Sequence, residues 1–390
     1  MISGTEWEKR TLAECTEIIS GGTPKTSVDE YWDGEICWAT PKDLSELSSP
    51  YISNTPRKVT QLGLEKSSAN ILPEGSVLFS SRAPIGHVAI NTVPMATNQG
   101  FKSFIPDADV LDAKFLYWWL RSHRARLEAL GNGATFKEVS KAVVSKVRLP
   151  LPPLEEQKRI AEVLDRAEAL RARRRAALSL LDELTQSIFL DMFGDPVTNP
   201  EGWPIRPIVE LAENKDSMRV PIKQSDRDER SGKYPYYGSV GIIDDIDDFI
   251  YEGPHLLISE DGKHLETRNR PIACLADGQF WVNNHAHVLA ANGNAELVFL
   301  AFNLEMRPLH QFVTGIDQFK LNRKSMDKIP VAVPPIELQQ EFAQRIRAIE
   351  DQKSRFEAHL GELGSLFASL QSRAFKGELF GCSLEPVAAD

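Results

Sequence analysis

The sequence predicts an α+β protein in which two β-rich α/β domains are separated by a long coiled coil of two helices. Residues 149–192 contain a helical run that is too long for one compact domain to cover, and residues 331–376 contain a second run of the same kind. The segments that precede the two runs also share one plan. A repeat of this size takes priority over local motifs. We therefore expect a tandem duplication in which domains and long helices alternate along residues 1–150, 151–195, 196–330 and 331–390.

The first long helix follows a proline-stiffened lead, Leu151-Pro152-Pro153-Leu154, and carries two glutamates in its first turn. Proline before a helix fixes the approach of the chain, and acidic side chains suit the positive end of the helix dipole. Apolar residues then recur at helical spacing over about 36 residues, or roughly 54 Å. The apolar stripe consists of Ile160, Val163, Leu164, Ala167, Leu170, Leu178, Leu181, Leu184 and Ile188.

The second long helix follows the same lead 182 residues later, since Pro334 stands where Pro152 stood (334 − 152 = 182). Its heptad positions a and d are apolar except at Lys353, a pattern typical of coiled coils. We expect these positions to pack against the first helix along a seam formed by Ile160, Leu164, Leu178, Leu181, Ile188, Phe342, Ile346, Ile349, Phe356, Leu360, Leu363, Phe367 and Leu370.

A basic residue interrupts the seam at one equivalent place in each helix, because the offset of 182 aligns Arg171 with Lys353. Such a residue could fix the register of the two helices. It could also be a long side chain that leaves the seam to reach water, which is the interpretation we favour. The run Arg173, Arg174 and Arg175 beside it could face DNA, a partner protein or water.

Composition limits the class of protein. Cys15, Cys37, Cys274 and Cys382 are scattered singly, which fits neither a zinc site nor a disulfide framework. No run is long and apolar enough for a membrane span or a signal region, so we expect a reduced, cytoplasmic protein with no membrane partner. The net charge of −10 argues against a surface coated for non-specific nucleic-acid binding, but it allows local basic clefts.

The first domain is expected to be mixed. Residues 35–40 alternate like a strand and run into a Pro-Lys-Asp-Leu turn at 41–44, and a Pro-Glu-Gly turn precedes a buried strand that ends near residue 79. Further strands are expected at 85–90 and 96–104. Residues 113–130 form an amphipathic helix with Trp118 and Trp119.

The second domain repeats these features with different residues. GPHLLIS at 253–259 stands where GSVLFSS stood, and VNNHA at 282–286 matches TNQGF at 97–101. A helix at 296–303 matches the start of the helix at 113–130, and Phe319-Lys320 precedes the second Pro-Pro lead as Phe136-Lys137 precedes the first. The two helices keep their pattern closely, whereas the domains keep only a skeleton. We infer two related but distinct recognition modules.

Motifs along nearly the whole chain are characteristic of one protein family. The most specific are LPLPPLEEQKRIAEVLD at 149–165 and its second copy VAVPPIELQQEFAQRI at 331–346. Supporting motifs are ISGGTPKT at 19–26, WATPKDL at 38–44, GSVLFSSRAPIGHVAI at 75–90, YPYYGSVGIIDD at 234–245 and AFKGEL at 374–379. On these motifs the chain resembles the DNA-specificity subunit of type I restriction-modification systems.

The resemblance implies that each domain is a target-recognition domain that reads one half of a bipartite site in double-stranded DNA. It implies an antiparallel helix pair, within a pseudo-two-fold arrangement, that spaces the domains and docks methyltransferase subunits. We expect two such subunits, with restriction subunits joining indirectly. The resemblance also implies a non-catalytic chain without its own cofactor, with S-adenosylmethionine and ATP on the partners. The chain has no Gly-rich S-adenosylmethionine loop, no Asn-Pro-Pro-aromatic motif and no phosphate-binding GxxxxGK[ST] loop.

Candidate DNA contacts are forked donors and amides, because arginine and lysine pair with guanine while asparagine and glutamine pair with adenine. In the first domain they are Lys42, Arg57, Lys58, Arg82, Asn98, Gln99 and Lys137. In the second they are Tyr236, Lys263, His264, Arg268, Arg270, Asn283, Asn284, Lys320, Arg323 and Lys324.

Structural roles compete with several of these assignments. Asn98 and Gln99 could bind a loop backbone, and Tyr236 and Tyr237 are more often core aromatics than base-stacking groups. His285 and His287 have the spacing of metal ligands, but no third ligand is near in sequence, so we expect a structural pair and no metal. The alternative to a DNA-recognition subunit is a coiled-coil scaffold that pairs two protein-binding domains.

Overall fold

The computed structural model describes residues 7–82, 84–133, 137–316 and 318–380. The chain divides into two compact units, one comprising the residues up to Arg173 and from His359 onward, the other Arg174–Ala358. Each unit therefore contains one globular part and one end of each long helix. Over the residues that the structure describes, no helix combines the length and apolar character needed to cross a membrane.

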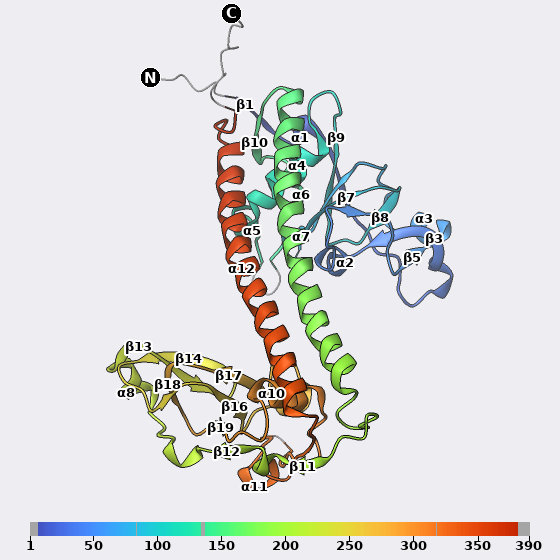
Figure 1. The fold of residues 1–390 in the computed structure, drawn as a ribbon. Coiled ribbons are helices and arrows are strands. Elements are labelled where there is room, and N and C mark those ends of the chain that lie inside the picture. Colours follow the sequence, from blue (N-terminus) through green and yellow to red (C-terminus); the bar gives the residue numbers. More distant parts are fainter. Residues whose placement is uncertain (1–6, 83, 134–136, 317, 381–390) are drawn as a thin grey trace, which may run out of the picture. The chain divides into compact units, whose positions relative to one another are not determined.

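The first unit has two sheets and a strand pair (Figure 1). The five-stranded sheet has the order β2 (Thr16–Ser20), β9 (Lys102–Pro106), β6 (Val77–Phe79), β7 (Val88–Asn91), β4 (Tyr51–Ile52). The three-stranded sheet has the order β5 (Lys58–Val59), β3 (Trp32–Ala39), β8 (Met95–Thr97), with β3 and β8 parallel. The short helices are α1 (Leu12–Cys15), α2 (Pro41–Ser45), α3 (Gln61–Glu65), α4 (Ala113–Ser122), α5 (Arg124–Ala129) and α6 (Lys141–Val144).

The second unit repeats this plan. One sheet has the order β12 (Ala212–Asn214), β19 (Ala286–Ala291), β16 (His255–Ser259), β17 (Ala273–Ala276). The other has the order β14 (Gly241–Ile246), β13 (Ser231–Gly238), β18 (Gln279–Val282), β15 (Tyr251–Glu252), with β13 and β18 parallel. The short helices are η2 (Ile208–Glu210), η3 (Asp216–Met218), α8 (Gln224–Asp228), α9 (His264–Thr267), α10 (Leu297–Met306) and α11 (Arg323–Met326).

A two-stranded antiparallel pair precedes each long helix. β1 (Glu8–Thr11) pairs with β10 (Arg148–Leu151), and β11 (Ile205–Pro207) pairs with β20 (Pro330–Ala332). In both pairs the second strand leads directly into a Pro-Pro lead. The start of each globular part is thus fixed to the start of the long helix that follows it.

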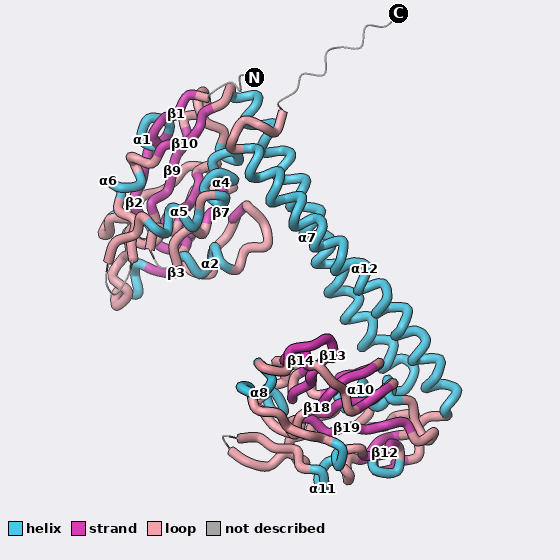
Figure 2. The backbone as a smooth tube through the Cα atoms, turned by 90° about the vertical axis from the view of Figure 1, so that its left-hand side faces the viewer, coloured by secondary structure: helices cyan, strands magenta, loops and turns pink. Residues whose placement is uncertain are grey.

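The long helices are α7 (Leu154–Phe193) and α12 (Ile336–Ala374), of 40 and 39 residues. They lie side by side and run antiparallel (Figures 1 and 2). In the first unit the guanidinium of Arg171 lies 4.7 Å from the ring centroid of Phe367, and in the second unit Phe189 packs against Phe342 with centroids 5.6 Å apart. Later residues of α7 therefore meet earlier residues of α12.

A buried glutamine in the first helical turn makes the same contacts in both units. Gln157 accepts a hydrogen bond from the amide of Asp112, the residue that caps α4, at 2.8 Å, and its amide group donates to the carbonyl of Pro152 at 2.9 Å. Gln339 accepts from the amide of Glu296, which precedes α10, at 3.0 Å, and donates to Pro334 at 2.7 Å. Each glutamine thereby joins a Pro-Pro lead to the main helix of its own unit.

The ends of the long helices complete the two main cores. Ile160, Leu164 and Ala167 of α7 join Phe367 and Ala374 of α12 in the core that contains α4. In the second unit, Phe189 and Phe193 of α7 join Phe342, Ala343 and Ile346 of α12 in the core that contains α10. All the side chains expected in the seam are buried or half-buried. Several of them pack on a globular core as well as on the other helix.

Three expectations differ from the structure. The helix expected at 113–130 is two helices, α4 and α5, that meet at His123. The turn expected at 41–44 is the short helix α2, which Thr40 and Asp43 cap by a reciprocal hydrogen-bonded box. Leu170 and Leu184 are 50% and 45% exposed. They lie outside the seam because the inward face of α7 continues through Arg171 and Thr185 instead.

Candidate nucleic-acid interface

Loops from several strands of the first unit meet at one end of its sheets. The amide of Asn98 donates to the carbonyl of Ala39, and the amide of Ser81 donates to the carbonyl of Gly100. The amide of Gly22 donates to the carbonyl of Thr97, and the bridge between Arg82 and Glu138 adds the segment before α6. We call residues 21–25, 39–42, 80–82, 97–101, 132–133 and 137–138 the first loop cluster.

The second unit builds the same backbone arrangement from other residues. The amide of Asn283 donates to the carbonyl of Tyr237, and the amide of Glu260 donates to the carbonyl of His285. Asp261 forms a bridge with Lys320, as Arg82 does with Glu138. We call residues 237–241, 259–264, 283–287, 314–316 and 318–320 the second loop cluster. These bonds confirm the predicted match of VNNHA with TNQGF.

The match of the segments before the Pro-Pro leads differs by one residue from the expected one. The bridges align Lys320 with Glu138 rather than with Lys137. This alignment has the offset of 182 that also relates the two leads (320 − 138 = 182). Phe136, which the sequence pattern matches with Phe319, lies outside the described residues.

Most candidate residues of the first domain lie in or beside the first loop cluster. Lys42 is exposed on α2, 3.7 Å from Glu46, and Lys137 is exposed next to the bridge. Gln99 accepts a hydrogen bond from Thr23, whereas Asn98 binds the backbone amide of Gly100 at 2.9 Å. Asn98 therefore has the loop-supporting role that we weighed against DNA contact.

Lys58 begins β5, the edge strand of the three-stranded sheet, and Arg57 directly precedes it. The guanidinium of Arg57 lies 3.8 Å from the ring centroid of Trp32 and 5.3 Å from that of Trp38. The indole of Trp38 donates to the carbonyl of Gly22 at 2.9 Å. Arg57 therefore lies against the two tryptophans, one of which supports the Gly21-Gly22 loop. A planar guanidinium stacks on such rings better than an ammonium does.

The candidates of the second domain separate into exposed and internal groups. Lys263, Arg270, Asn284, Lys320, Arg323 and Lys324 are exposed. Tyr236 is fully buried and its hydroxyl accepts from the amide of Ile222, which is the core role that we weighed against base stacking. His264 is buried against the Ser259 hydroxyl, and Asn283 binds the amide of His285 at 2.8 Å. Arg268 caps the end of α10 through the carbonyls of Leu304 and Arg307.

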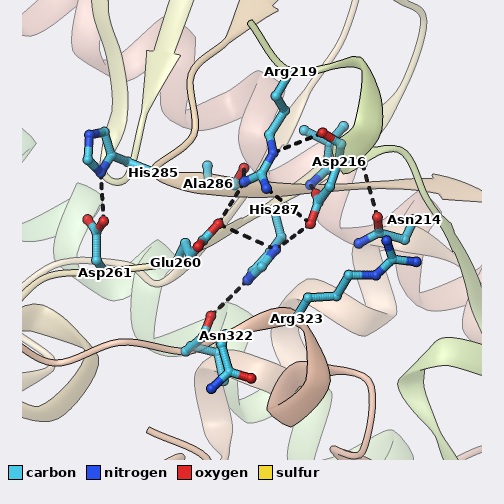
Figure 3. A network of polar contacts seen from close by, with 12 residues as sticks. Asn214, Asp216, Arg219, Glu260, Asp261, His285, Ala286, His287, Asn322 and Arg323 are labelled. Carbon is cyan, nitrogen blue, oxygen red and sulfur yellow. Dashed lines mark hydrogen bonds and ion pairs between the residues drawn. The ribbon is translucent and has the colours of Figure 1, made fainter. Parts of the chain in front are cut away.

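A network of charged side chains connects the second loop cluster with Asp216 and Arg219 (Figure 3). Glu260 directly follows β16. Its carboxylate lies 2.7 Å from Nη1 of Arg219 and 3.1 Å from Nζ of Lys320. The carboxylate of Asp216, in η3, lies 2.6 Å from Nδ1 of His287 and accepts a hydrogen bond from the amide of Val288 at 2.8 Å. The two carboxylates thus contact an arginine, a lysine and a histidine. These contacts fix the segments that carry the five side chains to one another.

Both ring nitrogens of His287 have an oxygen atom within hydrogen-bonding distance. Its Nδ1 faces the carboxylate of Asp216, and its Nε2 lies 2.8 Å from the carbonyl oxygen of Leu321. Both ring nitrogens of a side chain that is only 1% exposed are therefore satisfied within the chain.

The carboxylates of this network ionise more readily than usual. Burial alone would raise the pKa of Asp216, but the hydrogen bond and charge of His287, the Val288 amide and Arg219 together lower it. Burial would also raise the pKa of Glu260, but Arg219, Lys320 and His287 outweigh it, so this pKa is lowered too. The two carboxylates are therefore charged over the ordinary pH range.

The spacing of His285 and His287 does not form a metal site in the described part of the chain, where no cluster of three potential ligands occurs. The two rings point to different partners. His285 is exposed and its Nδ1 lies 2.6 Å from Asp261, whereas His287 is buried in the network.

Sequence reasoning did not select Asp216, Arg219, Glu260 or Asp261. Asp216 and Arg219 precede the loops by many residues, and no local pattern connects them with His287. Glu260 and Asp261 could have been found by aligning the repeats, since SEDGK at 259–263 stands where SSRAP at 80–84 stands.

Comparison with known proteins decides the family. The family profile described as "Type I restriction modification DNA specificity domain" matches residues 4–179 and 200–362. The chain belongs to this family. The two matched stretches also coincide with the duplication seen in the strands and loops.

Relatives of this family member include two specificity subunits of type I restriction enzymes. That of MjaIX from Methanocaldococcus jannaschii is 31% identical over 236 residues, which are 56% of this chain and 54% of the relative. This match spans about half the length of that relative. That of EcoprrI from Escherichia coli is 24% identical over 358 residues, 87% of this chain and 86% of the relative.

Solved structures share the fold at low sequence identity. The S subunit of a type I restriction-modification system from M. genitalium has a TM-score of 0.63 and 16% identity, with 96% of this chain and 97% of that chain covered. A chain from a study of complex assembly and conformational transition of the type I system has a TM-score of 0.57 and 17% identity, with 96% and 99% covered.

Proposed function

We propose that this chain is the DNA-recognition subunit of a type I restriction-modification complex, and that each unit reads one half of a bipartite double-stranded site through its loop cluster. The observation that carries the proposal is the repeated backbone frame with different side chains on it. The same hydrogen bonds between loops recur at Asn98 and Asn283 and at Ser81 and Glu260. A shared frame with a changed surface suits two modules that bind the same kind of ligand but prefer different base sequences.

The exposed cations around the loops support contact with the DNA backbone. Lys42 and Lys137 belong to the first loop cluster, and Lys263 and Lys320 to the second. Lysine and arginine contacts to phosphate give affinity and register, while base contacts give specificity. A chain with a net charge of −10 can bind DNA when its cations are concentrated at such loops.

The paired helices suit two further roles, spacing the half-sites and docking partner proteins. At about 1.5 Å per residue, a helix of 40 residues is about 60 Å long. Leu170, Leu180, Leu184 and Leu190 are exposed on α7, and exposed apolar side chains along a helix favour a protein partner. We propose that two methyltransferase subunits dock on this surface, that restriction subunits join through them, and that these partners carry S-adenosylmethionine, ATP and all the catalytic groups.

The test is to purify the chain with its cognate methyltransferase subunit and to sequence the methylated bases in DNA of random sequence. We expect methylation within a site of two specified half-sites separated by a spacer of fixed length but free sequence. A single continuous site, or methylation without sequence preference, would overturn the proposal. Binding of the complex to duplex DNA should also weaken steeply with salt because counterions are released.

A further inference from the structure

The two loop clusters have opposite charges at equivalent places. Arg82 in the first cluster stands where Asp261 stands in the second, because each forms the bridge to the segment before the following short helix. Glu138 stands where Lys320 stands for the same reason. The backbone bonds of the two clusters match, so the reversal is a difference in chemistry on one frame rather than a difference in fold.

Asp261 is held in place while it remains accessible. Its Oδ2 lies 2.6 Å from Nδ1 of His285, and the two side chains are 35% and 50% exposed. The preceding residue, Glu260, is 12% exposed and anchored by Arg219 and Lys320. The bridge to Lys320 fixes the backbone of Asp261 itself. The carboxylate is therefore paired with His285 and partly exposed on a fixed backbone (Figure 3).

A carboxylate on a DNA-binding surface is unfavourable beside phosphates, since the charges repel. It is favourable where it accepts a hydrogen bond from a base, and in the major groove the donors are the exocyclic amino groups of cytosine and adenine. Positive charge lies close to Asp261 in the chain: Lys263, two residues on, is exposed, and Lys320, across the bridge, is 53% exposed while its ammonium pairs with Glu260. Because His285 occupies Oδ2, Oδ1 is the oxygen that would accept a hydrogen bond from a base.

We propose that Asp261, oriented by His285, accepts a hydrogen bond from the exocyclic amino group of an adenine or a cytosine in the half-site of the second unit. The inference rests on the proposed function and adds to it the chemical class of one base. Asp261 is the specificity-determining group, and His285 is a positioning residue that fixes the rotamer of the carboxylate.

The experiment uses the complex with its cognate methyltransferase and compares Asp261→Asn with the wild-type chain by sequencing methylated bases. Asp277→Asn is the matched control, an exposed aspartate in the turn between β17 and β18, at the far end of β16 from Ser259. We expect Asp261→Asn to lose about tenfold discrimination at one adenine or cytosine of one half-site, because one good base contact has about that effect. The other half-site and the Asp277→Asn motif should not change.

Base analogues test the contact itself. Purine in place of the affected adenine, or 2-pyrimidinone in place of the affected cytosine, removes only the amino group. The analogue should weaken binding by the wild-type complex several-fold and weaken binding by the Asp261→Asn complex little further. The analogue that weakens binding by the wild-type complex shows whether the contacted base is an adenine or a cytosine. His285→Gln should give a smaller loss at the same position, which a merely structural histidine would not do.

Two results would overturn the inference while the proposed function stands: an unchanged motif in Asp261→Asn, or an equal loss in both half-sites. Full sensitivity of the Asp261→Asn complex to the analogues would also overturn it. Failure of the wild-type complex to show a bipartite motif would overturn the proposed function first, so the two failures are distinguishable.

Discussion

At the scale of the residue, Gln157 and Gln339 explain why each long helix begins where it does. Both are fully buried, and each joins its own Pro-Pro lead to the first turn of α4 or α10. A buried amide with satisfied partners stabilises modestly, but its removal leaves the backbone groups without partners. The Pro-Pro-x-Glu-x-Gln motif is thus a structural junction, and its recurrence in the sequence reflects that role.

We predict that Gln339→Leu lowers the free energy of unfolding of the second unit by about 2–4 kcal/mol, because the Glu296 amide and the Pro334 carbonyl lose their partner. Thermal unfolding of the full chain measures the change. Gln340→Leu, at the exposed neighbouring position, is the control and should change stability by no more than about 0.5 kcal/mol. Equal effects of the two substitutions would contradict the junction role.

The second residue-scale prediction concerns pH. The pKa values of Asp216 and Glu260 are lower in the folded chain than their ordinary values. Their contribution to stability is therefore complete above the ordinary carboxyl range and is lost as pH falls through the lowered values. The protection of β19 against hydrogen exchange, relative to the intrinsic exchange rate at each pH, should fall below about pH 4, whereas the protection of β9 in the first unit should show no contribution from this network.

Asp216→Asn separates this effect from general acid sensitivity. The substitution removes the carboxylate that faces Nδ1 of His287 and the Val288 amide, so β19 should already exchange faster at pH 7, by a factor that corresponds to about 1–3 kcal/mol. The added acid sensitivity of β19 should then be smaller than in the wild-type chain. If β19 kept its full wild-type acid sensitivity in Asp216→Asn, the assignment of that sensitivity to the network would be contradicted.

At the scale of the element, the centre of the helix pair is held by polar side chains. Nζ of Lys353 lies 2.9 Å from Asp182 of α7 and 3.0 Å from Glu350 of its own helix. Burial alone would lower the pKa of Lys353, but these two carboxylates outweigh it and raise it. Lys353 therefore leaves the seam to reach two carboxylates, one of which lies on the other helix, and whether it fixes the register of the helices stays a prediction.

We predict that Lys353→Met leaves thermal stability unchanged or raises it, by up to about 4 kcal/mol, because an apolar side chain of similar length fills the seam without desolvating a charge. Arg355→Met at an exposed position of α12 is the control. A loss of more than about 2 kcal/mol in Lys353→Met alone would show that the ion pair is required for the register of the helices.

The elements also show what the sequence could and could not predict. Both long helices, five strands of the first unit (β3 and β6 to β9) and the match between the repeats follow from periodicity and from the Pro-Pro leads. Leu170 and Leu184 were wrongly assigned to the inward stripe of α7, because apolar character alone cannot show that Arg171 and Thr185 take the inward positions. The division of the helix at 113–130 also escaped prediction, since no Gly or Pro marks His123.

The parts of the candidate site that are defined by their position in the repeat were predictable from the sequence. The parts that depend on contacts between distant residues were not. The loops at 97–101 and 283–287 were matched from the sequence. Arg268 and His264 were chosen as basic residues of an exposed loop, but their side chains turn inward to α10 and Ser259. The network around His287 joins residues that are about seventy positions apart, as His287 and Asp216 are separated by 71 residues.

At the scale of the whole molecule, the same series of features occurs twice: a strand pair, two sheets, a loop cluster, a short helix (α6 or α11), a Pro-Pro lead and a long helix. The plan recurs in each unit with its own core. On the proposed function, the loop clusters set which bases are chosen and the helix pair sets the length of the spacer. These two properties should therefore be separable by substitution in the loops and by insertion in the helices.

The most direct test of this account is the spacer length of the methylated site after insertion of one heptad into each of α7 and α12, at facing positions in the centre of the pair. Seven residues add about 10 Å to a helix, which corresponds to about 3 base pairs of DNA. We predict unchanged half-site sequences and a spacer that is longer by about 3 base pairs. An unchanged spacer, or altered half-sites with the loops intact, would contradict the account.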